Sequence, residues 1–283
     1  MIEQKTPTLV IATHKGGAAK TTTAVNVAAE FGRAGLKVLL IDLAPQATAS
    51  LHIGKQHPAN VPVTMAKLLR GDVALLPDAI HEDTTLPNVS LIYASIDLDL
   101  VNEDLRNSAP RPSEELKMKL EPVAGLFDVI VIDTPPALNL LTRNGFAAAT
   151  HVLIPVESGS QYALYGITDL LTVMNSIKRI NPSLKNLGAL LVKHDERQTV
   201  CRLLSQLAIE SFDTVVPVRI SSSTKVNQAS ISKVSISMLD RSNKVAREYS
   251  ALADYLMDEM GLKRTKIRKK SSARKSDSKE VEA

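Results

Sequence analysis

The sequence is poor in aromatic residues and nearly free of cysteine. Among 283 residues there is no Trp, and Phe, Trp and Tyr together make up 3%. The hydrophobic core must therefore consist of Leu, Ile, Val and Ala, which is typical of a buried parallel sheet covered by helices. A single cysteine, Cys201, excludes a disulfide framework within the chain and is too few for an iron–sulfur cluster. We expect a protein of the reducing cytoplasm.

Long apolar runs are also missing. No stretch reaches the roughly 20 apolar residues that a membrane-spanning helix needs, and the N-terminus has no apolar signal-peptide core. Hydrophobic residues nevertheless make up 44% of the chain, enough for a large core. We expect one domain over residues 1–262. Residues 263–283 hold nine Lys or Arg and three Asp or Glu, so this tail carries a charge of +6. The rest of the chain carries −2, which gives the net charge of +4. We expect it to be a disordered, basic tail.

Residues 15–22 (KGGAAKTT) have the layout of a phosphate-binding loop. The pattern predicts a short apolar strand before it, at 8–13, and a helix after it, at 23–34. Gly16 and Gly17 let the backbone curl so that successive N–H groups point at phosphates, and the helix N-terminus adds positive charge. Lys20 would contact the β- and γ-phosphates, and Thr21 would bind Mg²⁺. Ala19 stands where Gly is usual, and Ala is tolerated in this loop if its φ is negative.

Two further apolar strands are predicted to end in a carboxylate. Residues 37–42 (KVLLID) end in Asp42, and residues 127–133 (FDVIVID) end in Asp133. Carboxylates at the C-terminal ends of parallel strands lie beside the crevice where ligands bind. Together with the phosphate-binding loop, Asp133 therefore indicates a Walker B strand that approaches Mg²⁺.

Strands and helices alternate along the rest of the chain. Further strands are predicted at 89–93, 152–156, 187–192 and 214–218, and helices at 64–69, 98–105, 113–120, 162–177, 200–211 and 245–260. This alternation predicts an α/β fold with a doubly wound, mostly parallel sheet flanked by helices, as in P-loop NTPases.

The sequence resembles the ParA/MinD family of deviant Walker-type ATPases, and within it the ParA/Soj-like DNA partition ATPases. The motifs that carry the resemblance are KGGAAKTT at 15–22, LLIDLAPQ at 39–46 and VIVIDTPP at 129–136. The resemblance covers nearly all of residues 8–260. It implies that the chain is an ATPase with ATP and Mg²⁺ as cofactors, and that two copies form an ATP-sandwich dimer.

The resemblance also implies roles for single residues. Lys15 would be the signature lysine that reaches the partner's phosphates, and Pro217 and Val218 would pack against the adenine. The nucleotide-binding set is then Lys15, Gly16, Gly17, Ala18, Ala19, Lys20, Thr21, Thr22, Pro217 and Val218, and the metal set is Thr21, Asp42 and Asp133.

Position 44 departs from the family's Asp-Leu-Asp-Pro-Gln pattern. In the family the second Asp of this pattern positions or activates the attacking water, but here the residue is Ala44. A methyl group can neither accept a proton nor orient a water molecule. The catalytic set implied by the family is Lys15, Lys20, Asp42 and position 44. We therefore expect nucleotide binding and dimerisation with impaired hydrolysis.

The resemblance implies a cytoplasmic, nucleoid-associated protein that binds non-specific DNA to segregate or position a DNA or protein cargo. A ParB-like or cargo-adaptor partner would stimulate its ATPase activity. DNA contacts of this kind are made by cations to phosphates. The candidate cations are Arg197 and Arg219, followed by Lys225, Lys233, Arg241 and Lys244.

Three alternatives remain open. A MinD-like, membrane-associated positioning ATPase would need an amphipathic C-terminal helix, and the tail KIRKKSSARKSDSK has too few apolar residues to form one. An enzyme of the same fold, such as a dethiobiotin synthetase-like protein, is the second alternative. A transcription regulator is the third, but the phosphate-binding loop begins too early to leave room for a helix-turn-helix before it.

Overall fold

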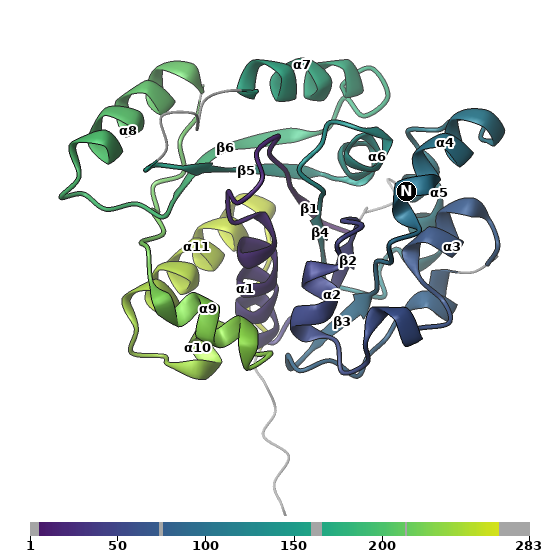
Figure 1. Cartoon of the computed structure of the whole chain (residues 1–283), viewed down its shortest axis with the longest axis horizontal. Coiled ribbons are helices and arrows are strands. Elements are labelled where there is room, and N and C mark those ends of the chain that lie inside the picture. Colours follow the sequence, from purple (N-terminus) through teal and green to yellow (C-terminus); the bar gives the residue numbers. More distant parts are fainter. Residues whose placement is uncertain (1–5, 74–75, 160–165, 213, 266–283) are drawn as a thin grey trace, which may run out of the picture.

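Six parallel strands form the sheet at the centre of the chain (Figure 1). The computed structural model describes residues 6–73, 76–159, 166–212 and 214–265. The strands are β1 (Thr8–Ile11), β2 (Val38–Asp42), β3 (Val89–Ile92), β4 (Val129–Asp133), β5 (His151–Glu157) and β6 (Lys185–Val192). They lie in the order β3-β2-β4-β1-β5-β6, and every neighbouring pair is parallel. The predicted α/β fold with a doubly wound parallel sheet is confirmed.

Helices cover both faces of the sheet because successive strand residues point to opposite sides. Leu9 and Ile11 of β1 pack into one cluster, and Val10 packs into the other. The first face is covered by α1 (Lys20–Arg33), α2 (Thr48–Ile53), η1 (Pro58–Asn60), α9 (Thr224–Ile231), α10 (Ile236–Leu239) and α11 (Lys244–Met260). The second is covered by α3 (Met65–Arg70), η2 (Leu76–Ala79), α4 (Leu98–Ser108), α5 (Glu115–Leu120), η3 (Glu121–Val123), α6 (Leu140–Ala148), α7 (Ile167–Ile177) and α8 (Thr199–Ser211).

The predicted strand at 214–218 is wrong. This segment makes only an isolated parallel bridge, between Ala189 and Val215, at the free edge of β6. The Val216 N–H donates to the Ala189 carbonyl oxygen, and the next bond to β6 comes from the Ile220 N–H to the Leu191 carbonyl oxygen. The regular spacing of a parallel ladder is therefore interrupted between Val216 and Ile220. The first residues of the predicted helix at 162–177 lie outside the described part of the chain, and α7 is described from Ile167 on. The basic tail also lies outside it from residue 266 onward.

The topology brings the predicted functional segments to one edge of the sheet. β1 lies between β4 and β5, with β2 beyond β4, so the chain direction from strand to strand reverses around β1. Ile11 lies beside Asp133, and Asp133 lies beside Asp42. The phosphate-binding loop and both carboxylates therefore meet at the crevice where α/β sheets bind ligands. Within the described residues, no helix is long and apolar enough to cross a membrane.

Candidate functional site

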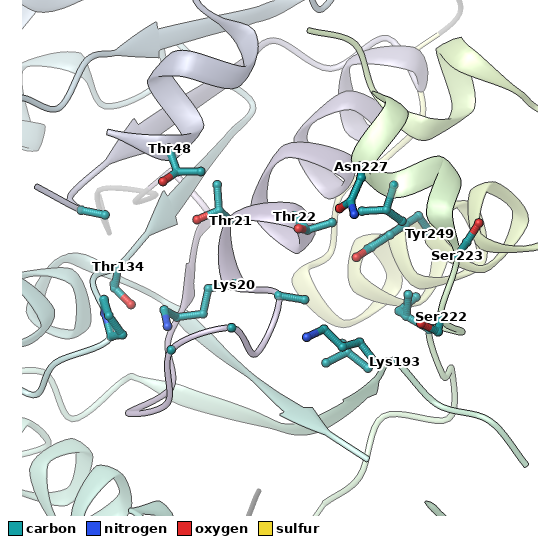
Figure 2. A pocket seen from close by; sticks show the side chains of 18 of the residues that line it. Lys20, Thr21, Thr22, Thr48, Thr134, Lys193, Ser222, Ser223, Asn227 and Tyr249 are labelled. Atoms are coloured by element: carbon teal, nitrogen blue, oxygen red, sulfur yellow. The ribbon is translucent and has the colours of Figure 1, made fainter. Parts of the chain in front are cut away.

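A cavity of about 710 Å³ opens at this edge of the sheet (Figure 2). One wall belongs to the loop at the start of α1 and to the ends of β2 and β4, namely Gly16, Gly17, Ala19, Lys20, Thr21, Thr22, Ala44, Gln46, Thr48, Thr134 and Pro136. The opposite wall is Val192, Lys193, Ile220, Ser221, Ser222, Ser223, Val226, Asn227 and Tyr249. Most of the predicted phosphate-binding residues are thus gathered on one side of a single cavity, but Lys15 and Ala18 do not line it.

The loop enters α1 through a left-handed residue. Gly17 has a φ of 76°, and Ala19, the residue before α1, has a φ of 57°. The condition of a negative φ at Ala19 is not met, because the chain turns into the helix at this residue. An L-residue in this conformation costs about 1–2 kcal/mol, whereas Gly adopts it readily.

Lys20 crosses back over the loop that precedes it. Its Nζ donates a hydrogen bond to the carbonyl oxygen of Lys15 at 3.0 Å, and the residue is 6% exposed. Burial lowers the pKa of Lys20, while the nearby Asp133 carboxylate acts in the opposite direction. The ammonium is therefore held inside the curl of the loop, where a phosphate can replace the carbonyl as its partner.

Thr21 connects the cavity to the buried end of β4. Its hydroxyl donates to Oδ2 of Asp133 at 2.6 Å. Oδ1 of Asp133 is buried and has no hydrogen-bond partner among the described residues. Burial, together with the neighbouring Asp42 carboxylate, raises the pKa of Asp133 to about 8. A hydroxyl on the cavity wall backed by a carboxylate oxygen without a partner fits the oxygen ligands that Mg²⁺ prefers.

The Asp42 carboxylate accepts hydrogen bonds from residues that follow it closely in the chain. Its Oδ1 accepts a hydrogen bond from the Ala44 N–H at 3.0 Å. Its Oδ2 accepts from the Ser50 N–H at 2.9 Å and from the Ser50 hydroxyl at 2.8 Å. Burial raises the pKa of Asp42 to about 6 against these hydrogen bonds. Asp42 therefore shapes the turn that carries Ala44 into the cavity wall, and its place in a metal shell stays a prediction.

Lys15 lies at the start of the loop and forms an ion pair across to the end of β5. Its Nζ is 2.9 Å from Oε2 of Glu157, and Lys193 Nζ is 3.0 Å from Oε1 of the same carboxylate. Burial raises the pKa of Glu157, but the two lysines outweigh it and leave this pKa below its ordinary value. One carboxylate thus holds two lysines at the edge of the cavity.

Pro217 and Val218 are not among the residues that line the cavity, so their contact with a base stays a prediction. The wall that they precede is formed by residues 220–223 together with Asn227 and Tyr249 (Figure 2). Sequence reasoning missed Lys193, Thr134 and Tyr249. The first two directly follow strand ends, which is a usable signal, but Tyr249 looks like an ordinary core residue of a helix.

Comparison with known proteins agrees with this geometry. The model of the AAA domain family matches residues 6–186. The chromosome partitioning protein ParA of Myxococcus xanthus is 34% identical over 262 residues, with 88% of this chain and 87% of that protein covered. The chain belongs to the ParA/MinD family of ATPases.

Two further relatives of this ParA/MinD-family ATPase are similar over most of their length. The chromosome-partitioning ATPase Soj of Treponema pallidum is 32% identical, with 87% of this chain and 95% of that protein covered. The crystal structure of cobyrinic acid a,c-diamide synthase from Mycobacterium smegmatis, with bound ATP analog and magnesium, is 32% identical and has a TM-score of 0.80. That match covers 90% of this chain and 95% of that chain.

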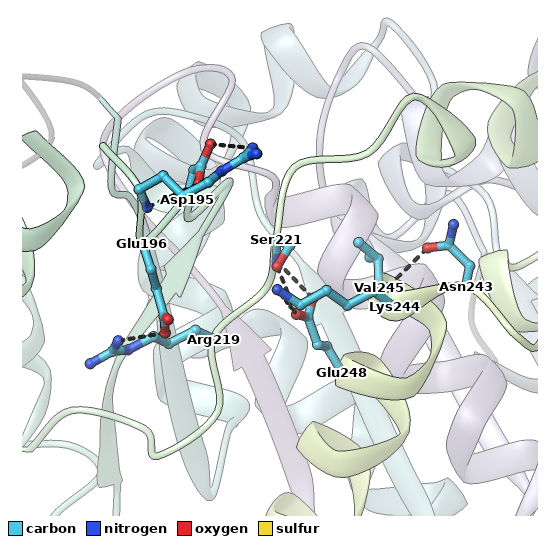
Figure 3. Close-up of polar contacts among 9 residues, drawn as sticks. Asp195, Glu196, Arg219, Ser221, Asn243, Lys244, Val245 and Glu248 are labelled. Atoms are coloured by element: carbon cyan, nitrogen blue, oxygen red, sulfur yellow. Dashed lines mark hydrogen bonds and ion pairs between the residues drawn. The ribbon is translucent and has the colours of Figure 1, made fainter. Parts of the chain in front are cut away.

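Three of the candidate DNA-binding cations of this ParA/MinD-family chain surround a second hollow, of about 440 Å³ (Figure 3). Each is paired with a carboxylate. Arg197 contacts Asp195 at 3.0 Å, Arg219 contacts Glu196 at 3.2 Å and Lys244 contacts Glu248 at 3.6 Å. The structure does not bring Lys225, Lys233 and Arg241 to this hollow. Lys233 instead donates to the carbonyl oxygen of Gly54 at 3.3 Å.

Proposed function

We propose that this chain binds Mg-ATP, forms an ATP-sandwich dimer and, as a dimer, binds DNA without sequence preference. Its task would be to segregate or position a DNA or protein cargo on the nucleoid in the cytoplasm. The observation that carries the proposal is the arrangement of Lys20 and Thr21 on one side of the cavity, with the buried Asp133 hydrogen-bonded to Thr21 behind it. The ParA and Soj relatives support the partition role.

For nucleotide binding, residues 16–22 would hold the phosphates through backbone N–H groups and the start of α1. Lys20 would exchange the Lys15 carbonyl for phosphate oxygens. Thr21 would hold Mg²⁺, with Asp133 behind it and Asp42 shaping the neighbouring turn. The bound Mg²⁺ would neutralise charge on the triphosphate.

For dimerisation, Lys15 would leave Glu157 and reach the phosphates bound by the partner subunit. A contact of this kind is isologous, because the same surface is used on both copies. Ala44 would leave the dimer without the carboxylate that activates water, so hydrolysis would be slow and the dimer long-lived.

For DNA binding, the cations around the second hollow would exchange their carboxylates for backbone phosphates. A ParB-like or cargo-adaptor protein would act as the partner that stimulates hydrolysis. The basic tail is a second possible DNA contact through the release of counterions.

Size-exclusion chromatography with light scattering tests the dimer. With Mg-ATP the chain should elute as a dimer, and with ADP or without nucleotide as a monomer. Lys15→Gln should remain monomeric with ATP while still binding it. A monomer of the wild-type chain at saturating Mg-ATP would refute the sandwich.

DNA binding is tested with a fluorescent duplex of arbitrary sequence at several salt concentrations. Arg219→Ala should weaken ATP-dependent binding and reduce the slope of log affinity against log salt by about 1. Arg106→Ala is the matched control, because Arg106 is exposed on α4 and the second hollow is not lined by it. Equal losses in the two variants would contradict the assignment.

A further inference from the structure

One short loop forms part of both hollows. Ser221 and Ser222 line the 710 Å³ cavity that holds the phosphate-binding residues, and they also line the 440 Å³ hollow that holds Arg197, Arg219 and Lys244. The path of this loop therefore decides the shape of the cavity wall opposite the phosphate-binding loop.

The loop is held by backbone hydrogen bonds up to its first residue. The Ile220 N–H donates to the Leu191 carbonyl oxygen at 2.9 Å, and the His194 N–H donates to the Ile220 carbonyl oxygen at 2.9 Å. On the other side, the Ser223 hydroxyl accepts from the Lys225 N–H at 3.2 Å and caps α9. Between these two anchors, Ser221 forms an isolated parallel bridge with His194, beyond the end of β6.

Besides this bridge, the side chain of Glu248 holds the loop at Ser221. The Ser221 N–H donates to Oε2 of Glu248 at 2.7 Å, and the Ser221 hydroxyl donates to Oε1 at 2.7 Å (Figure 3). The Glu248 side chain is 16% exposed, so water competes poorly for both bonds. Hydrogen bonds to an ionised acceptor are about twice as strong as neutral ones.

Glu248 itself stands on the helix that supports the nucleotide cavity. α11 packs against α1, and the next residue, Tyr249, lines the cavity with its hydroxyl 3.5 Å from the Thr23 hydroxyl of α1. The loop at Ser221 is therefore anchored to the same pair of helices, α1 and α11, that supports the phosphate-binding loop.

We infer that Glu248 is a positioning residue of the nucleotide site, which sets the distance between the two walls of the cavity through Ser221. It does not touch the nucleotide; it holds the backbone that does. The inference rests on the proposed function only in taking a nucleotide as the ligand of this cavity, and it requires neither the dimer nor DNA.

The test is the affinity of the chain for a fluorescent ADP derivative with Mg²⁺ and without DNA. Glu248→Gln keeps an oxygen for the Ser221 N–H and offers the Ser221 hydroxyl an NH₂ group instead of an oxygen, but it removes the negative charge that strengthens both bonds. It should therefore weaken binding several-fold. The rate of single-turnover ATP hydrolysis at saturating ATP should stay unchanged, because Thr21 and Ala44 lie on the opposite wall. A general loss of structure would lower both quantities.

Two controls complete the experiment. Glu259→Gln makes the same change of charge at an exposed position of α11, and it should bind ADP like the wild type. Ser221→Ala should weaken binding, and its effect should not add to that of Glu248→Gln, because both changes break the same contact. If Glu248→Gln binds ADP as tightly as the wild type, the inference is wrong. If the wild type itself does not bind ADP, the proposed function fails instead.

Discussion

At the scale of single residues, two alanines set this site apart from the pattern of its family. Ala44 places a methyl group on the cavity wall where the family pattern has a carboxylate. Ala19 holds a left-handed conformation at the start of α1 that Gly would adopt without strain. The first change concerns chemistry and the second concerns stability, so they can be tested separately.

Replacing Ala44 by Asp should restore hydrolysis. A carboxylate at this position can orient and deprotonate water, and general-base groups contribute typically 10²–10⁴-fold. We expect Ala44→Asp to hydrolyse ATP at least about 100-fold faster than the wild type in single-turnover assays. Ala44→Asn is the control, since it has similar size but no basic oxygen and should stay slow. A wild-type rate as fast as that of Ala44→Asp would contradict this.

Replacing Ala19 by Gly should stabilise the protein by about 1 kcal/mol, because relief of the left-handed strain exceeds the entropy gained by the unfolded chain. Urea unfolding measures the difference. Ala18 is the matched control, because it is a neighbour without a positive φ. Ala18→Gly should lower the free energy of unfolding by about 0.5–1 kcal/mol. A destabilised Ala19→Gly would show that φ at this residue is not left-handed.

At the scale of elements, the short helix α2 supports the loop after β2. Ser50 of α2 donates two hydrogen bonds to the buried Asp42 and accepts one from the Ala94 N–H at 3.0 Å. Its hydroxyl therefore ties the ends of β2 and β3 together.

Removing the Ser50 hydroxyl should lower the free energy of unfolding of the protein. Ser50→Ala leaves a buried carboxylate oxygen and a buried N–H each with one partner fewer, and we expect a loss of about 2 kcal/mol in the free energy of unfolding. Ser230→Ala, at an exposed position of α9, should change it by less than about 0.5 kcal/mol. A similar small effect at both positions would mean that Ser50 does not support Asp42.

Elements with a strong local pattern could be predicted from the sequence, and those defined by distant partners could not. The apolar strands that end in Asp42 and Asp133 were predicted almost to the residue. Helix α2 was missed because it is short and its main role is the contact of Ser50 with another element. The segment at 214–218 has the composition of a strand, but its hydrogen bonds to β6 skip from Val216 to Ile220, and no local pattern marks that interruption.

The site follows the same division. The phosphate-binding loop could be predicted because its glycines, lysine and threonine lie together in the sequence. Glu157, Lys193 and Glu248 could not, since each acts through a partner that only the fold brings near. The conformation of Ala19 could not be predicted, because its φ depends on how the loop meets α1.

At the scale of the whole molecule, the lysine proposed to reach a partner's phosphates forms an ion pair within its own subunit. Lys15 and Lys193 share Glu157, and the Lys15 side chain is 28% exposed. In the proposed dimer, Lys15 would have to give up this ion pair to reach a partner's phosphates, so Glu157 would oppose dimerisation. A partly exposed pair of this kind contributes up to about 1 kcal/mol.

Glu157→Gln should therefore lower the ATP concentration needed for half-maximal dimerisation, roughly threefold. Light scattering over an ATP titration measures this. Glu114→Gln is the control. Glu114 forms an ion pair with Lys117 of α5, and its substitution makes the same change of charge away from the cavity. If Glu157→Gln needs more ATP than the wild type, Glu157 assists Lys15 instead of restraining it.

The central position of β1 has a consequence for the order in which the protein is built. Val10 pairs with Ile132 on one side and Val152 on the other, and both leave the ribosome long after it. Such non-local parallel pairing forms slowly, because the entropy cost of closing the long loops comes before the stabilising contacts between the strands. The phosphate-binding loop is thus among the first segments to be translated and among the last to reach its native conformation. Nucleotide can therefore stabilise the folded protein by binding to it, but it cannot bind before the sheet has formed.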